Sequence, residues 1–326
     1  MNLPWFDKGA FPLFLAPMAG VTDPIFRTIC KGLGADVMVT EFVSAEGVLQ
    51  CWERNKRYTE FSDEHRPLGI QLFGANANHL GEAAKIIVNE QHPDFIDINF
   101  GCPVPKVVGK NGGSSLLKDL PTLAAVVRGA VKAVGHLVPI TAKIRIGWDA
   151  HSICALEVCH ILEQEGASMI TIHGRTRTQQ YSGLANWDII RECARSTNLP
   201  VIGNGDIHSV HDIQKIKGKG DVRGVMIGRA AMENPWIFQE AAHFLKTGEI
   251  LPPQSRIAKW DLILHHTQLS IESKRYGDEL NTMKFMRARL LAYSKGFPGA
   301  KDLRSRLVKV SSLAELDKLR DFVLSL

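Results

Sequence analysis

Short apolar runs alternate with longer amphipathic segments from residue 13 to about residue 235. Several of these runs are apolar throughout, which is typical of parallel strands that are covered on both faces. The segments between them are long enough for one crossover helix each, as in Pro121–Val134 and His151–Glu165. Eight runs are predicted strands: Leu13–Ala16, Val37–Phe42, Gly69–Phe73, Phe95–Phe100, Ile140–Ile144, Ser168–Ile172, Val201–Gly203 and Gly224–Ile227.

Eight evenly spaced β/α units predict an α/β fold closed into a (β/α)8 TIM barrel. A doubly wound open sheet is the structural alternative, but the even spacing favours closure. The pattern changes near Thr247, where Leu251-Pro252-Pro253 predicts a linker and the strand signals stop. Three helical patterns follow, at 256–275, 280–295 and 312–325. We therefore expect a barrel over residues 1–245 and a small all-helical tail domain over residues 246–326.

The composition is that of a chain with a large buried core, since 45% of its 326 residues are hydrophobic. No apolar run approaches the roughly 20 residues that would span a bilayer. The N-terminal stretch also lacks the cleavage pattern of a signal peptide. We therefore expect a cytoplasmic protein that does not contact a membrane. The six cysteines include no Cys-x-x-Cys pair, so neither a zinc nor an iron–sulfur site is indicated, and no metal is expected.

The positive charge of the chain is concentrated near its C-terminal end. The formal net charge is +5, yet residues 251–326 hold 14 Lys/Arg and 8 Asp/Glu, whereas residues 1–250 hold 25 and 26. A polyanion that docks on the tail domain is one interpretation of this asymmetry. A solvated helical surface with surplus lysine is the other, and the charge alone does not decide between them.

Polar residues and glycines gather where the predicted strands end. Barrel enzymes build their active sites from the carboxyl ends of the strands and the loops that follow them. The opposite ends of the same strands show nothing comparable. The residues concerned are Pro17-Met18-Ala19-Gly20, Gln71, Asn99-Phe100-Gly101-Cys102-Pro103, Lys143 and Arg145, His173-Gly174-Arg175, Asn204-Gly205-Asp206 and Gly228-Arg229.

The last two of these loops indicate a phosphate site. Barrels often bind phosphate after strands seven and eight, through backbone N–H groups and the start of a short helix. Gly203-Asn204-Gly205 and Gly228-Arg229 offer bare backbone and one cation at these positions. Glycines that only make tight turns are the alternative for either loop. A Rossmann dinucleotide site is not indicated, because Gly32-Leu33-Gly34 has Val37 in place of the third glycine.

Lys143 and Cys102 are the candidate chemical groups. Lys143 lies on an otherwise largely apolar strand, where it needs a partner because an unpaired buried charge is costly. That partner is either a carboxylate, Asp97 or Glu41, or the electron-rich edge of a cofactor such as the N1/C2 side of a reduced flavin. Cys102 is either a buried structural cysteine or a proton donor, since a thiol with a pKa of about 8.5 is mostly protonated at neutral pH.

Five segments at these strand ends resemble the tRNA-dihydrouridine synthase family, in its bacterial, FMN-dependent type. The pattern Asn99 to Pro103, with Gly113-Ser114 downstream, is specific to this family, and the resemblance extends over the whole chain. Each of the other segments would fit several FMN-binding barrels, but here they occur jointly and in order. The five segments are Ala16–Asp23, Asp97–Pro103, Lys143–Arg145, Thr171–Thr176 and Met226–Arg229.

The resemblance implies a set of roles around an FMN cofactor. Cys102 would act as general acid and protonate C5 of a uracil ring whose C6 accepts hydride, while Asn99 and Arg145 would bind that uracil. NADPH would reduce the FMN in a separate step, and the target base would be flipped out of the RNA. The cofactor-binding residues would be Pro17, Met18 and Ala19 along the flavin, Gln71 and Lys143 at its ring, and His173, Asn204, Gly205, Asp206, Gly228 and Arg229 around its ribityl phosphate.

The resemblance also assigns expected functions to the two domains. Residues 1–245 would be the FMN-binding catalytic barrel, and residues 246–326 would bind tRNA in a salt-sensitive manner. The protein is expected to act as a monomer. Two alternatives are an FMN barrel that reduces a free pyrimidine or another small enone, and a flavin- or RNA-binding protein without catalysis.

Overall fold

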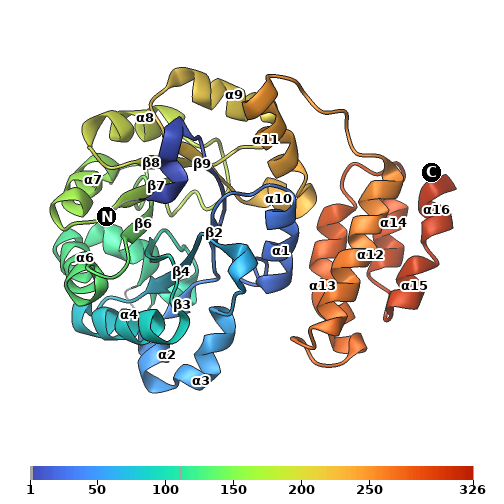
Figure 1. The fold of residues 1–326 in the computed structure, drawn as a ribbon, viewed down its shortest axis with the longest axis horizontal. Coiled ribbons are helices and arrows are strands. Elements are labelled where there is room, and N and C mark those ends of the chain that lie inside the picture. Colours follow the sequence, from blue (N-terminus) through green and yellow to red (C-terminus); the bar gives the residue numbers. More distant parts are fainter. Residues whose placement is uncertain (1–2, 110–111, 326) are drawn as a thin grey trace.

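The computed structural model describes residues 3–109 and 112–325, and its larger part is a barrel of parallel strands surrounded by helices (Figure 1). Around the barrel the strand order is β1-β9-β8-β7-β6-β5-β4-β2, and a parallel bridge between Phe14 and Val37 brings β1 beside the start of β2. The predicted (β/α)8 barrel is thus confirmed. The strands are β1 (Leu13–Leu15), β2 (Met38–Val39), β3 (Val43–Ser44), β4 (Leu68–Phe73), β5 (Phe95–Phe100), β6 (Ile140–Arg145), β7 (Met169–His173), β8 (Val201–Asn204) and β9 (Gly224–Ile227).

Helices connect the strands and form the outer layer of the barrel. They are α1 (Pro24–Gly32), α2 (Ala45–Gln50), α3 (Trp52–Asn55), α4 (Ala77–Gln91), α5 (Pro105–Val108), α6 (Leu120–Val134), α7 (Ala155–Gln164), α8 (Trp187–Ser196), α9 (Val210–Lys219), α10 (Arg229–Glu233) and α11 (Ile237–Thr247). Short 3-10 helices lie at Pro4–Gly9, Lys56–Tyr58, Asp63–His65 and Gly113–Lys118. None of the helices in the described part of the chain is long and apolar enough to cross a bilayer.

Only Met38–Val39 (β2) of the second predicted strand, Val37–Phe42, forms a regular strand, and a further short strand, β3, begins just beyond it at Val43. Between β2 and β3, Thr40 N–H still donates to Gly69 C=O at 2.9 Å, and the Thr40 hydroxyl accepts the backbone N–H of Gln71 at 3.2 Å. β3 then resumes parallel pairing with β4 further along. The interruption turns Glu41 and Phe42 toward the neighbouring loops, and Phe42 becomes part of the cavity wall described below.

The inside of the barrel changes from apolar to polar along the strands. At the amino ends, Trp5 and Phe14 join Phe95, Met169 and Met226 in one buried apolar cluster. Gly69 leaves room for this cluster, because a Cβ at that position would lie 2.1 Å from the ring of its register partner Phe95. Further toward the carboxyl ends of the strands, the buried polar positions are Gln71, Asp97, Asn99, Thr141, Thr171, His173 and Asn204. The carboxyl ends of the strands are therefore the polar end of the barrel.

The tail domain contains five helices within its described residues, up to residue 325, where the sequence patterns predict three. The segment 312–325 is broken after α15, where Leu319 N–H donates to Leu316 C=O in a tighter turn. The helix at 300–307 is unpredicted because it follows Pro298-Gly299 and buries only Leu303 and Leu307 among mostly charged residues. The five helices are α12 (Arg256–Glu272), α13 (Glu279–Tyr293), α14 (Ala300–Leu307), α15 (Leu313–Asp317) and α16 (Arg320–Ser325).

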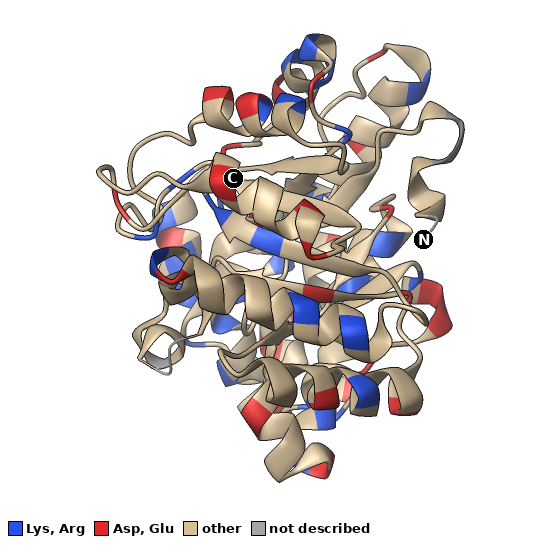
Figure 2. Cartoon of the chain, turned by 90° about the vertical axis from the view of Figure 1, so that its left-hand side faces the viewer, with Lys and Arg blue, Asp and Glu red and all other residues tan. Residues whose placement is uncertain are grey.

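The tail domain has its own apolar cluster and packs against one side of the barrel, beside α1 and α10 (Figure 1). Part of its positive charge faces barrel carboxylates: Arg289 pairs with Asp23 at 2.6 Å, and Arg275 pairs with Glu60 at 2.8 Å. The opposite face of the barrel shows Lys/Arg and Asp/Glu interspersed (Figure 2). The charge surplus of the tail domain is therefore partly used in domain packing, which the sequence count does not reveal.

Candidate functional site

A cavity of about 610 Å³ opens at the carboxyl ends of the strands. All of the site residues predicted from the sequence line this one cavity, so the structure brings them together. They are Pro17, Met18, Ala19, Gln71, Asn99, Cys102, Lys143, Arg145, His173, Asn204, Gly205, Asp206, Gly228 and Arg229. Among the residues that the structure describes, no group of three His, Cys, Asp or Glu side chains is arranged to hold a metal ion.

A chain of buried hydrogen bonds fixes the amide side chains at the cavity floor. Asp97 accepts hydrogen bonds from Thr141 Oγ1 and from Gln71 Nε2, both at 2.6 Å. Gln71 Oε1 in turn accepts a hydrogen bond from Asn99 Nδ2 at 2.8 Å. Each amide group has two N–H bonds, so Gln71 and Asn99 each retain one for a bound molecule. Burial raises the pKa of Asp97 against the opposing effect of these hydrogen bonds.

Lys143 has no carboxylate within ion-pairing distance among residues 3–109 and 112–325, so neither Asp97 nor Glu41 forms the alternative ion pair considered from the sequence. Its Nζ donates to Asn204 Oδ1 at 3.1 Å, and its exposed part faces the cavity. Burial and the charge of Arg145 lower the pKa of Lys143 to about 8, although Asp97 and Cys102 act in the opposite direction. Lys143 is therefore a cation in the cavity wall that has no carboxylate counter-ion among the described residues.

The Cys102 thiol is buried in the cavity wall, with 7% of its surface exposed. Burial raises the pKa of Cys102 above its ordinary value, despite the backbone N–H of Val104 and the charges of Arg145 and Lys143. The thiol is therefore protonated at neutral pH. This is the state that a proton donor requires, whereas a nucleophile would need a lowered pKa.

The backbone on both sides of the thiol is held in place. Asn99 Oδ1 accepts the N–H groups of Gly101 at 2.9 Å and Cys102 at 2.8 Å, and Ser114 Oγ donates to Cys102 C=O at 2.8 Å. Gly113 is required for this packing, because its φ is +59° and a Cβ there would lie 2.9 Å from the Cys102 carbonyl oxygen. The thiol is thus presented on a fixed loop.

Arg145 is largely committed to backbone carbonyls. Its Nε donates to Gly101 C=O at 2.8 Å, and its Nη1 donates to Thr176 and Gln180 C=O at 2.9 Å each. Only the N–H bonds of Nη2 remain for a ligand. Burial lowers the pKa of Arg145 to about 10, so it remains charged at neutral pH.

The loops after β8 and β9 form the other end of the cavity. Asp206 accepts Arg175 Nη2 at 2.6 Å and Ala185 N–H at 2.7 Å, and Arg229 Nη2 lies 3.4 Å from the same carboxylate. Gly205 adopts φ +123°, a conformation suited to glycine. The Asp206 carboxylate therefore orders the two arginines. The pKa of nearby His173 is lowered by burial and by Lys143, Arg145, Arg175 and Arg229, so its ring is neutral.

Comparison with known proteins identifies the family to which this chain belongs. The family model described as "Dihydrouridine synthase (Dus)" matches residues 14–324. The probable tRNA-dihydrouridine synthase of Aquifex aeolicus is 36% identical over 314 residues, which cover 96% of this chain and 95% of that protein. The tRNA-dihydrouridine synthase B of Pseudomonas putida is 38% identical over 296 residues, covering 90% of this chain and 86% of that protein. The chain belongs to the dihydrouridine synthase family.

Solved structures support the barrel fold of this dihydrouridine synthase family member. The histamine dehydrogenase of Rhizobium sp. 4-9 superposes with a TM-score of 0.53 at 14% identity, over 79% of this chain and 48% of that one. A likeness at this level of identity concerns the fold alone.

Several wall residues of this family member were not predicted from the sequence. Phe42, Gln180, Tyr181, His208 and Met232 line the cavity, and no strand-end pattern pointed to them. Tyr181 lies at the rim, 55% exposed, with the Arg145 and Arg229 guanidinium groups 5.8 and 4.9 Å from its ring centre. Arg175 was noted at a strand end without an assigned role, although it forms a buried ion pair with Asp206 in the cavity wall. Only its place in the Thr171–Thr176 segment could have indicated this.

Proposed function

We propose that the protein reduces the C5=C6 bond of uridines in tRNA to 5,6-dihydrouridine, with FMN as its bound cofactor and NADPH as the reductant. The catalytic barrel would comprise residues 1–245, the tRNA-binding domain residues 246–326, and the reaction would take place in the cytoplasm. Membership of the dihydrouridine synthase family supports the reaction. The chemical assignment rests on one observation: the protonated thiol of Cys102 shares a cavity with Lys143, a cation for which the described residues 3–109 and 112–325 supply no counter-ion.

The cavity residues fit an anionic ring cofactor with a phosphate. Lys143 has free N–H bonds and no carboxylate partner among the described residues, so an electron-rich ring edge would supply the missing acceptor. At the other end Arg229 lies beside Gly205 and Gly228. A Cβ at Gly228 would project into van der Waals contact with Met18 Sδ at 3.6 Å and would fill space between the first and last loops. Pro17, Met18 and Ala19 would line the ring, and Gln71 would donate its second N–H to it.

A bound FMN, after reduction by NADPH, would supply the hydride that adds to C6 of the uracil ring. The residues of the chain orient that ring and deliver the proton. Asn99 and Arg145 each have N–H bonds left for the polar edge of a uracil, and charge that develops at O4 would be stabilised there. The Cys102 S–H bond breaks as its proton moves to C5, and the resulting thiolate regains a proton from water.

The Cys102→Ala variant tests the assignment. We expect FMN affinity and NADPH oxidation close to wild type and tRNA reduction lower by about 10²-fold or more, because only the proton donor is removed. The substrate is tRNA purified from cells that lack this protein. After incubation with each purified variant, the dihydrouridine formed in that tRNA is measured by mass spectrometry. Cys51→Ala is the matched control, since Cys51 is exposed and does not line the cavity.

Wild-type tRNA reduction by Cys102→Ala would show that the thiol is not the proton donor. Free uridine, offered to the unmodified protein in parallel, separates the proposal from its alternative. Turnover of free uridine at the tRNA rate would favour a small-molecule reductase.

A further inference from the structure

The first loop of the cavity, residues 17–22, forms part of the cavity wall. Pro17, Met18, Ala19 and Val21 line the cavity. The loop is folded on itself, because Val21 and Thr22 N–H both donate to Met18 C=O at 3.0 Å. These internal bonds use the Met18 carbonyl, whereas the carbonyl groups of residues 20–22 find their partners outside the loop. The side chains that bind these carbonyl groups therefore fix the position of this part of the cavity wall.

Guanidinium groups bind three consecutive carbonyls of this loop. Arg289 Nη2, from α13 of the tail domain, lies 3.2 Å from Gly20 C=O and 3.0 Å from Val21 C=O. Arg27 Nη1, from the barrel itself, donates to Thr22 C=O at 2.5 Å. Two of the three carbonyls therefore depend on the tail domain.

Arg289 is itself locked at the domain interface. Its Nη2 also donates to Asp23 Oδ2 at 2.6 Å, and this pair is almost fully buried, with exposed side-chain fractions of 5% and 1%. The hydroxyl of Tyr276, in the turn between α12 and α13, donates to the same carboxylate oxygen. A buried ion pair with a third partner has a defined geometry, so the arginine is a fixed rather than a mobile donor.

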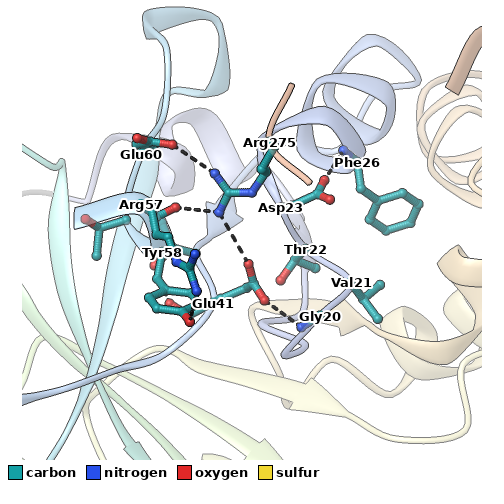
Figure 3. Close-up of polar contacts among 12 residues, drawn as sticks. Gly20, Val21, Thr22, Asp23, Phe26, Glu41, Arg57, Tyr58, Glu60 and Arg275 are labelled. Atoms are coloured by element: carbon teal, nitrogen blue, oxygen red, sulfur yellow. Dashed lines mark hydrogen bonds and ion pairs between the residues drawn. The ribbon is translucent and has the colours of Figure 1, made fainter. Parts of the chain in front are cut away.

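A second link from the tail domain reaches the same loop through Glu41, as Figure 3 shows. Gly20 N–H donates to Glu41 Oε1 at 2.5 Å, and Glu41 Oε2 faces Arg275 Nη2 at 4.0 Å. Arg275 also donates to Glu60 Oε2 at 2.8 Å and to Arg57 C=O. Glu41 thereby connects the tail domain to the backbone of the loop.

We propose that Arg289 and Arg275 are positioning residues for the first cavity loop, so that the tail domain shapes the cofactor side of the cavity in addition to docking RNA. Surface loops without such partners are mobile. This loop would lose its bonds at Gly20 and Val21 C=O without Arg289, and Glu41, which accepts Gly20 N–H, would lose a facing cation without Arg275. The inference rests on the proposed function only in treating the cavity as the FMN site.

Hydrogen–deuterium exchange of the cofactor-free protein and FMN titration by flavin fluorescence test the proposal together. In Arg289→Gln, amides in residues 16–23 should exchange about tenfold faster than in wild type, and the Kd for FMN should rise about tenfold, equivalent to about 1.4 kcal/mol. Arg275→Gln, at a less buried position, should shift both quantities in the same direction by a smaller factor. Arg289→Lys retains the charge toward Asp23 but cannot reach all three acceptors, so it should fall in between.

Two control variants separate positioning from general destabilisation. Phe26→Leu weakens the same interface by removing the ring that stacks on His266, yet it keeps every bond to the loop. Arg320→Gln removes a tail cation whose partner, Asp261, also lies in the tail domain. Both should keep loop exchange and FMN affinity within about twofold of wild type, even where the melting temperature falls.

Hydrogen–deuterium exchange and FMN titration together distinguish failure of this inference from failure of the proposed function. If Arg289→Gln and Arg275→Gln both exchanged and bound FMN like wild type, the positioning role would be wrong. If Phe26→Leu had the same effect as Arg289→Gln, the arginines would act only through domain packing. If wild type bound no FMN, the proposed function would fail, whereas the exchange data would still test the contact. Should Arg289→Gln fail to fold, Arg275→Gln and Arg289→Lys provide the same comparison.

Discussion

Lys143→Met is expected to make the cofactor-free protein more stable at neutral pH, although it removes a side chain from the proposed active site. The reason is that Lys143 is a buried cation with one hydrogen bond and no carboxylate partner among the described residues. Methionine has a similar length and no charge to desolvate. A side chain retained at the expense of stability is typical of a functional position.

The magnitude follows from the pKa of Lys143. Burial, with a smaller effect of Arg145, lowers it from 10.5 to about 8. At about 1.36 kcal/mol per pKa unit, the buried ammonium is destabilising by about 3 kcal/mol relative to the neutral amine. The variant also loses the hydrogen bond to Asn204, which is worth about 1 kcal/mol. The expected net stabilisation is therefore about 2 kcal/mol at pH 7.

The same shift sets the sign of the pH dependence. Below about pH 8, Lys143 is protonated in both the folded and the unfolded chain, so its full destabilising effect is present. Between about pH 8 and 10.5, the unfolded chain holds a proton that the folded chain has released, so the stability of the wild type rises with pH through this window. The advantage of Lys143→Met should shrink accordingly.

Urea unfolding of both proteins without cofactor, at pH 7 and at about pH 9.5, measures this difference by circular dichroism. Lys132→Met is the matched control, because Lys132 is exposed on α6 and its substitution should change stability little at either pH. A methionine variant that was less stable than wild type at pH 7, or a difference that did not vary with pH, would refute the description of Lys143 as an uncompensated cation.

Three further predictions concern the cofactor, the thiol loop and the RNA. Arg229→Gln should raise the Kd for FMN by about tenfold through loss of a charge-assisted phosphate contact, and a variant that stays fully loaded after dialysis would contradict this. Gly113→Ala should slow tRNA reduction by about tenfold while NADPH oxidation is unchanged, because its Cβ would displace the Cys102 loop, and equal tRNA rates would count against the fixed thiol. Neutralising Lys284 and Arg287 together should raise the KM for tRNA several-fold and flatten its salt dependence. Unchanged tRNA kinetics would remove that face of α13 from the docking surface.

The barrel and the location of the site could be predicted because their signals are local. Continuous apolar runs mark buried parallel strands, and the residue that follows each run is necessarily at the same end of the barrel. Asn99, Lys143 and Arg229 are therefore found in one cavity without knowledge of any long-range contact. The carboxyl-end rule requires only the order of the strands.

The partners of these side chains could not be predicted, because they depend on contacts between distant segments. Glu41 is a candidate partner of Lys143 by sequence, but in the structure its carboxylate accepts the N–H of Gly20 instead. Arg289 is one cation among many in the tail domain, and only the folded interface shows that it bonds to Asp23 and two carbonyls. The helix at 300–307 likewise owes its burial to the tail cluster rather than to a strong pattern.

The central claim is that the cavity reduces uridine within tRNA, and one measurement tests it directly. The purified protein, loaded with FMN and supplied with NADPH, is incubated with a tRNA transcript that carries no modified bases, and the nucleosides are analysed by mass spectrometry. A gain of two hydrogen atoms at specific uridines, matched by the NADPH consumed, is the predicted result. An FMN-loaded protein that oxidised NADPH but left every uridine of the transcript unchanged would contradict the account.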